Sequence, residues 1–264
     1  MNKKNILIAI LIITVIAILI TGVGVFIAKN VEQRVPNLDI ESFPDPLSYI
    51  GDCNDKTGIQ KEQCSLQRAA LTGDIEFCSQ THSNYTQEEC YAEIAIAQRN
   101  PSICEYSTKN VSKCKELYAI NNLDSLQCPP ENQMQCKTLV QQWIEKYKIQ
   151  SYDCEQMTPK VYDAAFSGAN NLSKKQQCFE FLANIELEPG YCDNLKSIVS
   201  NQNILQQCKN RAQKRDFTFE KCSTRMGYGH FRDVCFYQLA KQEKSSVFCE
   251  YIKLDVLKNR CLNN

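Results

Sequence analysis

The spacing of the cysteines constrains the fold more than any other feature of this sequence. From Cys64 onward, the second cysteine of one pair is followed by the first cysteine of the next pair after 14 residues, in six of seven steps. The exception is the step from Cys136 to Cys154, which is 18 residues long. A fixed spacing of this kind indicates an internal repeat.

Each repeat has the pattern of a helix, a tight polar turn and a short returning helix. Five positions after the starting cysteine the residue is alanine in five repeats, and large or aromatic side chains recur one and four positions after it. These offsets share one helical face, so the pattern predicts a buried face that a neighbouring helix approaches closely. The sequence therefore predicts an all-α fold, a solenoid-like array of αα-hairpins, with the repeated aromatic residues in its core.

Polar residues mark the expected helix starts. Capping-box patterns predict that helices begin after Thr57, Thr86 and Ser173. Four further residues are expected to cap the short returning helices, namely Asp74, Asn100, Asp124 and Ser245.

The sixteen cysteines can be paired in two regular ways. Pairing across the loops of variable length gives Cys53–Cys64, Cys78–Cys90, Cys104–Cys114, Cys128–Cys136, Cys154–Cys178, Cys192–Cys208, Cys222–Cys235 and Cys249–Cys261. The alternative, such as Cys90 with Cys104, joins positions offset by roughly 9 Å along a hairpin, which exceeds disulfide geometry. Spacing favours the loop-closing pairs, but sequence alone leaves both connectivities open.

The repeat is irregular at residues 128–178. Cys128-Pro129-Pro130 begins the shortest loop, and the loop from Cys154 to Cys178 is the longest. Such a region is either a junction between two halves or a loop that carries function.

The N-terminal segment predicts a membrane anchor. Residues 5–28 contain no charged side chain and are long enough to span a bilayer, which favours an uncleaved transmembrane signal anchor over a cleaved signal peptide. We therefore expect three parts: a short cytoplasmic tail with the anchor (1–28), a proline-containing linker (29–48) and a repeat ectodomain (49–264).

Cysteine usage predicts where the ectodomain lies. Disulfides persist outside the reducing cytosol, so we expect a single-pass protein of the cell membrane with its N-terminus inside and its C-terminal domain extracytoplasmic. The lipid bilayer is then the partner of residues 5–28. The chain has 30 basic and 30 acidic residues, a balance that does not call for a nucleic-acid partner.

Motifs for catalysis or metal binding are not found in the sequence. No two cysteines are closer than eight residues, which disfavours zinc, and no G-x-S-x-G nucleophile motif occurs. His82 and His230 are expected to be exposed loop residues. The acidic pairs Glu88/Glu89 and Glu186/Glu188 and the basic run Lys209, Arg211, Lys214 and Arg215 are expected to be solvated. We thus expect no catalytic residue, no metal and no cofactor.

Three sequons lie in the loops of variable length. Asn84, Asn110 and Asn171 are therefore candidate N-glycosylation acceptors.

The pattern from Cys53 to Cys261, apart from 136–178, resembles that of uncharacterised cysteine-rich α-helical hairpin repeat proteins, membrane-anchored or secreted, of archaea and small-genome bacteria. The cysteine, the alanine five positions later and the next cysteine at position 14 carry this resemblance. It implies an extracellular placement and brings no catalytic residues with it.

Three functional hypotheses follow from these observations. The first is a cell-surface binding or interaction protein without catalysis, whose partner is a protein or glycan. The alternatives are a structural subunit of a surface layer or filament, and an envelope glycan hydrolase with two carboxylates.

Overall fold

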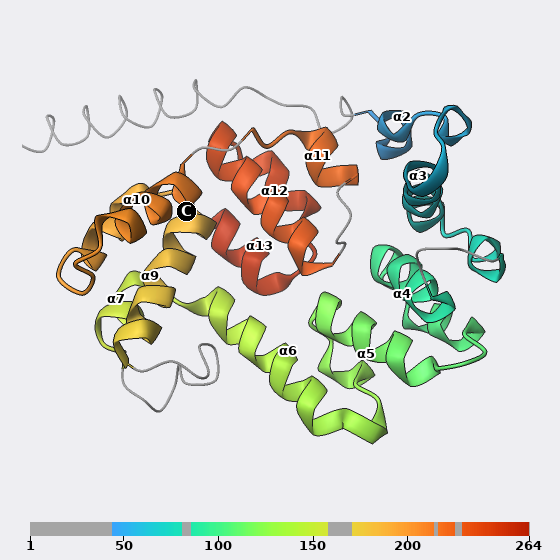
Figure 1. The fold of residues 1–264 in the computed structure, drawn as a ribbon, viewed down its shortest axis with the longest axis horizontal. Helices are drawn as coiled ribbons and strands as arrows, with labels where there is room; N and C mark the ends of the chain where they lie inside the picture. The colour runs from blue at the N-terminus through green and yellow to red at the C-terminus, as the bar shows by residue number, and fades with distance from the viewer. Residues whose placement is uncertain (1–43, 81–85, 158–170, 214–215, 225–228, 264) are drawn as a thin grey trace, which may run out of the picture. The chain divides into compact units, whose positions relative to one another are not determined.

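The structure, a computed structural model, describes residues 44–80, 86–157, 171–213, 216–224 and 229–263. Within these ranges the chain forms helices and no strand, which confirms the all-α fold class (Figure 1). The expected membrane helix at 5–28 and most of the expected linker at 29–48 lie outside them. Among the helices that are described, none combines the length and the apolar character needed to cross a bilayer.

The first described helix begins slightly before the expected start of the folded region at Tyr49. Helix α2 (Pro46–Ile50) has a proline in its first turn, where the missing N–H costs no hydrogen bond. Asp45 caps it by accepting a hydrogen bond from the Leu47 backbone N–H at 3.0 Å. A proline assigned to the linker from sequence therefore starts a helix.

The repeats are built from longer helices that alternate with short ones. The longer helices are α3 (Gly58–Thr72), α4 (Gln87–Gln98), α5 (Val111–Asn122), α6 (Gln133–Lys148), α9 (Asn171–Glu186), α10 (Gln202–Ala212), α12 (His230–Glu243) and α13 (Asp255–Leu262). The returning segments are mostly 3₁₀ helices: η3 (Glu76–Ser79), η4 (Pro101–Tyr106), η5 (Ser125–Gln127), η7 (Pro189–Leu195) and η8 (Ser246–Tyr251). Two others are short α-helices, α7 (Ser151–Glu155) and α11 (Phe219–Thr224). The 3₁₀ helices η2 (Cys53–Asp55) and η6 (Pro130–Asn132) precede α3 and α6. The returning helices are short, as the spacing predicted.

Some of the expected caps form and others do not. The capping box at Thr86 is confirmed, and the side chains of Asp74, Asn100 and Asp124 each accept a backbone N–H two residues later, at 3.1 Å. Thr57 makes no side-chain cap, and Ser245 makes none either. Ser173 was predicted to precede its helix, but α9 already begins at Asn171. The predicted helix starts at Thr57 and Ser245 are still confirmed, because α3 begins at Gly58 and η8 begins at Ser246. Only the start predicted at Ser173 was wrong.

The backbone carbonyl of the repeated alanine accepts the hydrogen bond that closes the C-terminus of the longer helices. In five repeats the residue nine positions after the cysteine is left-handed, with φ between 50° and 75°: Gly73, Arg99, Leu123, Leu187 and Lys244. The residue after it donates its N–H to the carbonyl of the alanine, as Ser245 does to Ala240 at 3.0 Å. This six-to-one bond closes a Schellman motif, so the alanine is both a packing position and the acceptor that ends its helix.

Eight disulfides staple the short helices to the longer ones. They join the same partners as the loop-closing pairs, and no cysteine is free. Their Cα–Cα distances run from 5.4 Å at Cys222–Cys235 to 5.9 Å at Cys192–Cys208, within ordinary disulfide geometry. All the cysteines except Cys261 are buried. The disulfides are therefore part of the core.

Packing is not limited to consecutive repeats. Helices α3, α4, α5 and α6 contact one another in chain order, and α9 contacts α10. The C-terminal repeat departs from this order, because α12 contacts both α5 and α9, and α13 contacts α6 (Figure 1). Helix α11 also contacts α2. In a linear solenoid each repeat contacts only its neighbours, so these contacts differ from the expected solenoid-like array.

The start of α12 shows how closely these elements approach. Gly229 has φ 73°, and a Cβ built on it would lie 2.2 Å from the backbone oxygen of Asn121 at the end of α5. Only glycine avoids both the backbone strain and this conflict. The glycine therefore allows α12 to begin directly against α5.

Candidate functional site

The residues singled out in the sequence are scattered over the structure. Asn110 is exposed at the start of α5. Asn171 is the first residue of α9, while Asn84 and His82 lie outside the described residues, as do positions 158–170 of the longest loop. His230 was expected to be exposed but is the first residue of α12 and only 2% exposed. The prediction was wrong because the first turn of α12 packs against Trp143 and Tyr147 of α6, which are distant in the sequence.

His230 is enclosed by aromatic side chains. Its Nδ1 shares a hydrogen bond with the Tyr147 hydroxyl at 2.9 Å, and the Trp143 ring lies edge-on to it with centroids 4.8 Å apart. Burial, together with the nearby Arg99 charge, lowers the pKa of His230 to about 4. The imidazole is therefore neutral at physiological pH and tethers α12 to α6.

Asp233 lies one turn further along α12 and is equally buried. Its Oδ2 accepts hydrogen bonds from the Arg99 guanidinium at 2.9 Å and from the Leu254 backbone N–H at 2.7 Å. Burial raises the pKa of Asp233, and Arg99 and the backbone donors oppose this only in part. The contact joins α4, α12 and the segment before α13.

A second charged network surrounds Glu186 at the end of α9. Its carboxylate accepts hydrogen bonds from the Tyr237 hydroxyl at 2.7 Å and from Arg260 Nε at 2.7 Å, and it pairs with Lys241 at 2.9 Å. Burial alone raises the pKa of Glu186, but these partners together lower it below its ordinary value. Arg260 also donates to the backbone oxygens of Tyr147 and Ile149. This network joins α9, α12 and α13 to the end of α6.

These interior groups hold repeats together. The Asp233 side chain is 1% exposed, and the Glu186 side chain is 7% exposed and paired with two cations. A hydrolase of glycans needs two carboxyl groups that flank a substrate, one of them free to give up a proton. Both carboxylates are instead engaged with side chains of the chain itself, which is the arrangement of a structural contact.

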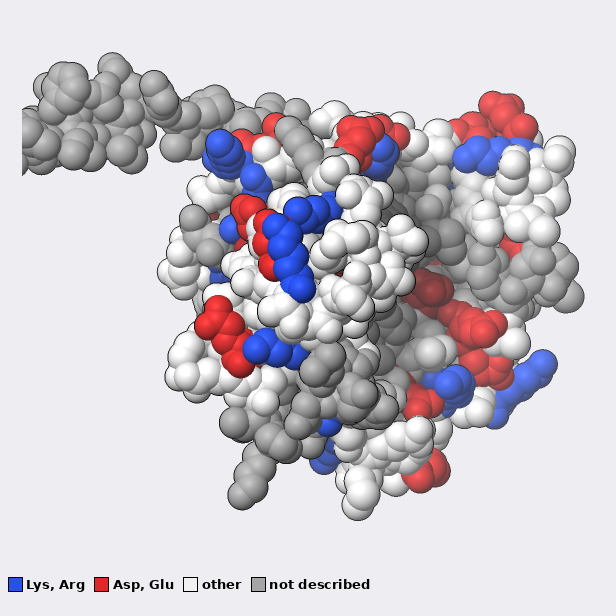
Figure 2. Space-filling view, turned by 60° about the vertical axis from the view of Figure 1, so that its left-hand side comes forward, with Lys and Arg blue, Asp and Glu red and all other residues white. Residues whose placement is uncertain are grey.

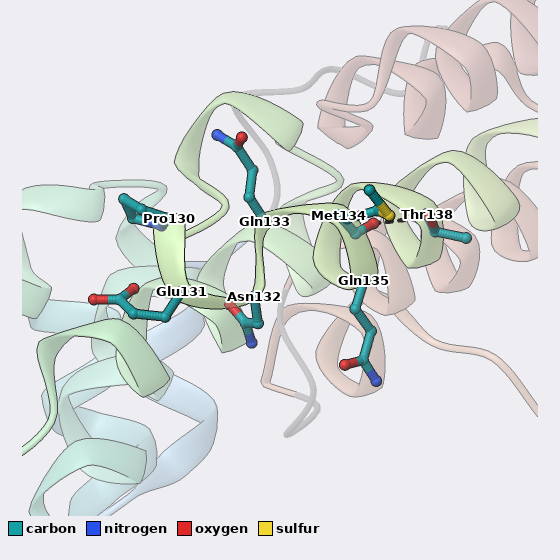
Figure 3. A pocket seen from close by; sticks show the side chains of 7 residues that line it. All are labelled: Pro130, Glu131, Asn132, Gln133, Met134, Gln135 and Thr138. Atoms are coloured by element: carbon teal, nitrogen blue, oxygen red, sulfur yellow. Dashed lines mark hydrogen bonds between the residues drawn. The ribbon is translucent and has the colours of Figure 1, made fainter.

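An open depression lies at the start of α6, in the irregular part of the repeat array. It has a volume of about 660 Å³ and is lined by Pro130, Glu131, Asn132, Gln133, Met134, Gln135 and Thr138 (Figure 3). Figure 3 shows the side chains of Gln133 and Gln135 pointing in opposite directions from this segment. The lining contains one carboxylate, that of Glu131, and no histidine. Such a surface can hydrogen-bond a partner through its amides, but it lacks an acid–base pair.

Two large apolar side chains stand out from the same region. Leu126 is 87% exposed and Met134 is 85% exposed. Each lies two residues before a cysteine of the Cys128–Cys136 disulfide, whose Cα atoms are 5.7 Å apart. Their own Cα atoms are therefore at most roughly 21 Å apart, since consecutive Cα atoms are about 3.8 Å apart. We call Leu126, the loop 128–136 and Met134 the stapled-loop surface.

The stapled-loop surface is held rigidly. Its disulfide closes the shortest of the eight loops, with a sequence separation of 8, and Pro129 and Pro130 restrict the backbone within it. Asn132 donates a hydrogen bond to Glu116 of α5 at 2.6 Å, which anchors the loop to the neighbouring helix. Preorganised apolar groups lose little conformational freedom when a partner binds. The prolines and the short length of this loop could be recognised in the sequence. Nothing in the sequence predicted that Leu126 and Met134 would be exposed.

Comparison of the chain with protein-family models, with curated proteins and with solved structures found no match.

The described residues of the basic run, at the end of α10, pair with carboxylates. Lys209 pairs with Asp193 at 2.8 Å, and Arg211 pairs with Glu180 at 3.8 Å. Lys214 and Arg215 lie outside the described residues. Over much of the face in Figure 2, basic and acidic side chains lie close together. Over the described part of the chain, no group of three or more His, Cys, Asp or Glu side chains could hold a metal ion.

Proposed function

We propose that this chain is a membrane-anchored, extracytoplasmic helical-repeat protein that binds a partner at the cell surface and does not act as a catalyst. The anchor is the uncharged segment at residues 5–28, and the repeat ectodomain follows the linker at 29–48. Eight disulfides and no free thiol support an oxidising location for the ectodomain. Helix pairs that are joined by disulfides and also contact distant repeats form a scaffold that suits binding.

The stapled-loop surface is the observation that carries the binding role. Exposed leucine and methionine side chains are favourable contact groups because they gain apolar burial only when a partner covers them. Leu126 lies in η5 and Met134 in the first turn of α6, each two residues before a cysteine of the Cys128–Cys136 disulfide. A single protein interface, which covers about 800 Å² on each partner, is therefore wide enough to include them. The amide side chains of the depression supply hydrogen bonds around these apolar contacts.

The stapled-loop surface favours binding over hydrolysis. A glycosidase site requires two carboxyl groups about 5 to 9.5 Å apart, and the depression has one. Its open form also suits a large partner rather than an enclosed small molecule. We therefore place a protein or an extended glycan there.

The test is capture of envelope partners by the full-length chain, solubilised in detergent with its disulfides intact. The double variant Leu126→Asp/Met134→Asp should lose at least tenfold in bound partner, because each change puts a charge where an apolar contact is needed. The matched control is Ile59→Asp/Tyr152→Asp, which alters side chains that are 57% and 61% exposed on other elements.

The control should bind as the wild type does. Equal capture by both double variants and the wild type would count against the stapled-loop surface. Concentration-dependent assembly of the chain with itself, lost in the Leu126/Met134 variant alone, would instead favour the surface-layer subunit.

A further inference from the structure

We propose that Asn110 carries an N-linked glycan, a proposal that rests on the extracytoplasmic placement proposed above. The sequon Asn110-Val111-Ser112 lies where the loop closed by Cys104–Cys114 meets α5. Asn110 is exposed, so a glycan at this position would project into solvent. A bulky, polar modification is tolerated at such a place without disturbing the core.

Different atoms of the Asn110 side chain serve for helix capping and for glycosylation. Its Oδ1 accepts the Lys113 backbone N–H at 2.8 Å, and its backbone carbonyl accepts the Cys114 N–H at 3.4 Å. Within the described residues, Nδ2 has no hydrogen-bond partner. Glycosylation takes place at Nδ2, so the cap that starts α5 can persist when the sugar is attached.

The neighbouring residues leave room for the sugar. Lys109 is also exposed, while Ser107 is buried and Thr108 donates a hydrogen bond to Gln87 at 3.0 Å. The loop is therefore fixed on the side that faces α4 and open at Asn110. The disulfide holds this arrangement, because it joins the residues on either side of the loop.

The chemistry is a group transfer from a lipid-linked sugar donor, catalysed by a membrane-bound transferase on the extracytoplasmic side. The Nδ2–C1 bond to the first sugar forms and the bond between C1 and the donor phosphate oxygen breaks. The polyprenyl phosphate or diphosphate leaves, and the amide loses one proton. No oxidant or reductant is required, since nothing changes oxidation state.

Peptide mapping of the full chain isolated from its own cells tests the proposal. The peptides joined by Cys104–Cys114 should carry added sugar mass, and enzymatic removal of the sugar by a peptide N-glycosidase should convert Asn110 to aspartate. Ser112→Ala removes the sequon but keeps the cap, and Asn110→Asp keeps a capping oxygen but removes the acceptor nitrogen. Both variants should lose the sugar mass while retaining all eight disulfides.

Thermal unfolding provides the structural control. The melting temperatures of Ser112→Ala and Asn110→Asp should stay close to that of the enzymatically deglycosylated wild type, whereas Asn110→Ala should melt at a lower temperature because α5 loses its cap. An unmodified Asn110 on a chain whose ectodomain is protease-accessible from outside overturns this proposal alone. An ectodomain that stays inside the cell overturns both this proposal and the proposed function.

Discussion

At the scale of single residues, the interior is organised by ionisable groups that meet across large distances in the sequence. Asp233 and its partner Arg99 are 134 residues apart, and Arg260 and Glu186 are 74 apart. Each contact places one charge in the core, and an opposite charge and hydrogen bonds oppose its desolvation, fully at Glu186 and only in part at Asp233. Removal of one partner leaves the other buried without compensation, which makes these positions sensitive to substitution.

Arg99→Met should destabilise the fold by about 3 kcal/mol, because Asp233 is then left buried without its cation. Asp233→Asn added to Arg99→Met should recover part of the loss, since the amide is neutral and can still accept the Leu254 N–H. Lys244→Met is the matched control, since Lys244 has the same left-handed backbone as Arg99 and is exposed. Chemical denaturation of the wild type and the three variants is the measurement. Equal losses in Arg99→Met and Lys244→Met would contradict the role of the ion pair.

His230 should make the fold less stable in mild acid. Its pKa falls from an ordinary 6.5 to about 4 in the folded state, so the unfolded chain binds the proton first as pH decreases. The stabilisation is complete above pH 6.5 and is lost between pH 6.5 and 4, by up to about 3 kcal/mol. The raised pKa of Asp233 has the opposite sign, since its contribution is present at low pH and lost as pH rises.

The difference between the wild type and His230→Gln isolates the histidine contribution, because Asp233 is present in both. Denaturation curves at pH 7, 5.5 and 4 should show the wild type losing more stability than the variant over this interval. Parallel curves for the two proteins would show that His230 does not control the acid response.

At the scale of elements, the free-energy cost of the left-handed residues that end the helices can be tested directly. Four of these positions hold residues other than glycine: Arg99, Leu123, Leu187 and Lys244. An L-residue in this conformation costs about 1 to 2 kcal/mol relative to its right-handed form. The Schellman hydrogen bonds to the repeated alanine and the packing of the next segment offset this cost.

Lys244→Gly should therefore stabilise the fold by about 1 kcal/mol, because Lys244 is exposed and the change relieves backbone strain without loss of packing. Gly73→Ala should have the opposite effect of similar size, since a Cβ there meets only the Gln98 side chain at 3.4 Å and the strain dominates. Melting temperatures should shift by about 2 to 4 °C in opposite directions. A shift of the same sign in both variants would show that packing, rather than the backbone angle, controls these ends.

At the scale of the whole molecule, the disulfides and the contacts between distant repeats act together. Each disulfide closes a loop of 8 to 24 residues, worth on the order of 2.5 to 3.5 kcal/mol in the chain-entropy model. The C-terminal repeat then packs against α5, α6 and α9, which joins segments that are far apart in the chain. The disulfides thus constrain each hairpin, and the long-range contacts join the hairpins to one another.

Full reduction of the disulfides in mild denaturant should abolish the cooperative unfolding transition. The reduced hairpins lose the constraint on their unfolded states, and their individual apolar faces are too small to replace it. Circular dichroism during thermal unfolding, with complete thiol release verified by alkylation and mass, is the measurement. An unchanged melting curve in fully reduced protein would show that packing alone supports the fold.

The sequence by itself determined what depends on nearby residues. Periodicity predicted the repeat length, the all-helical class and the buried alanine face. Loop length favoured the disulfide partners of Cys90 and Cys104. Both work because helices and loop-closing bonds form between residues that are close in the chain. Tertiary structure alone decided the rest. Packing between distant segments buries His230, pairs Arg99 with Asp233 and brings α12 and α13 onto earlier helices. It also decides that Leu126 and Met134 stay exposed. Such contacts leave no local pattern in the sequence.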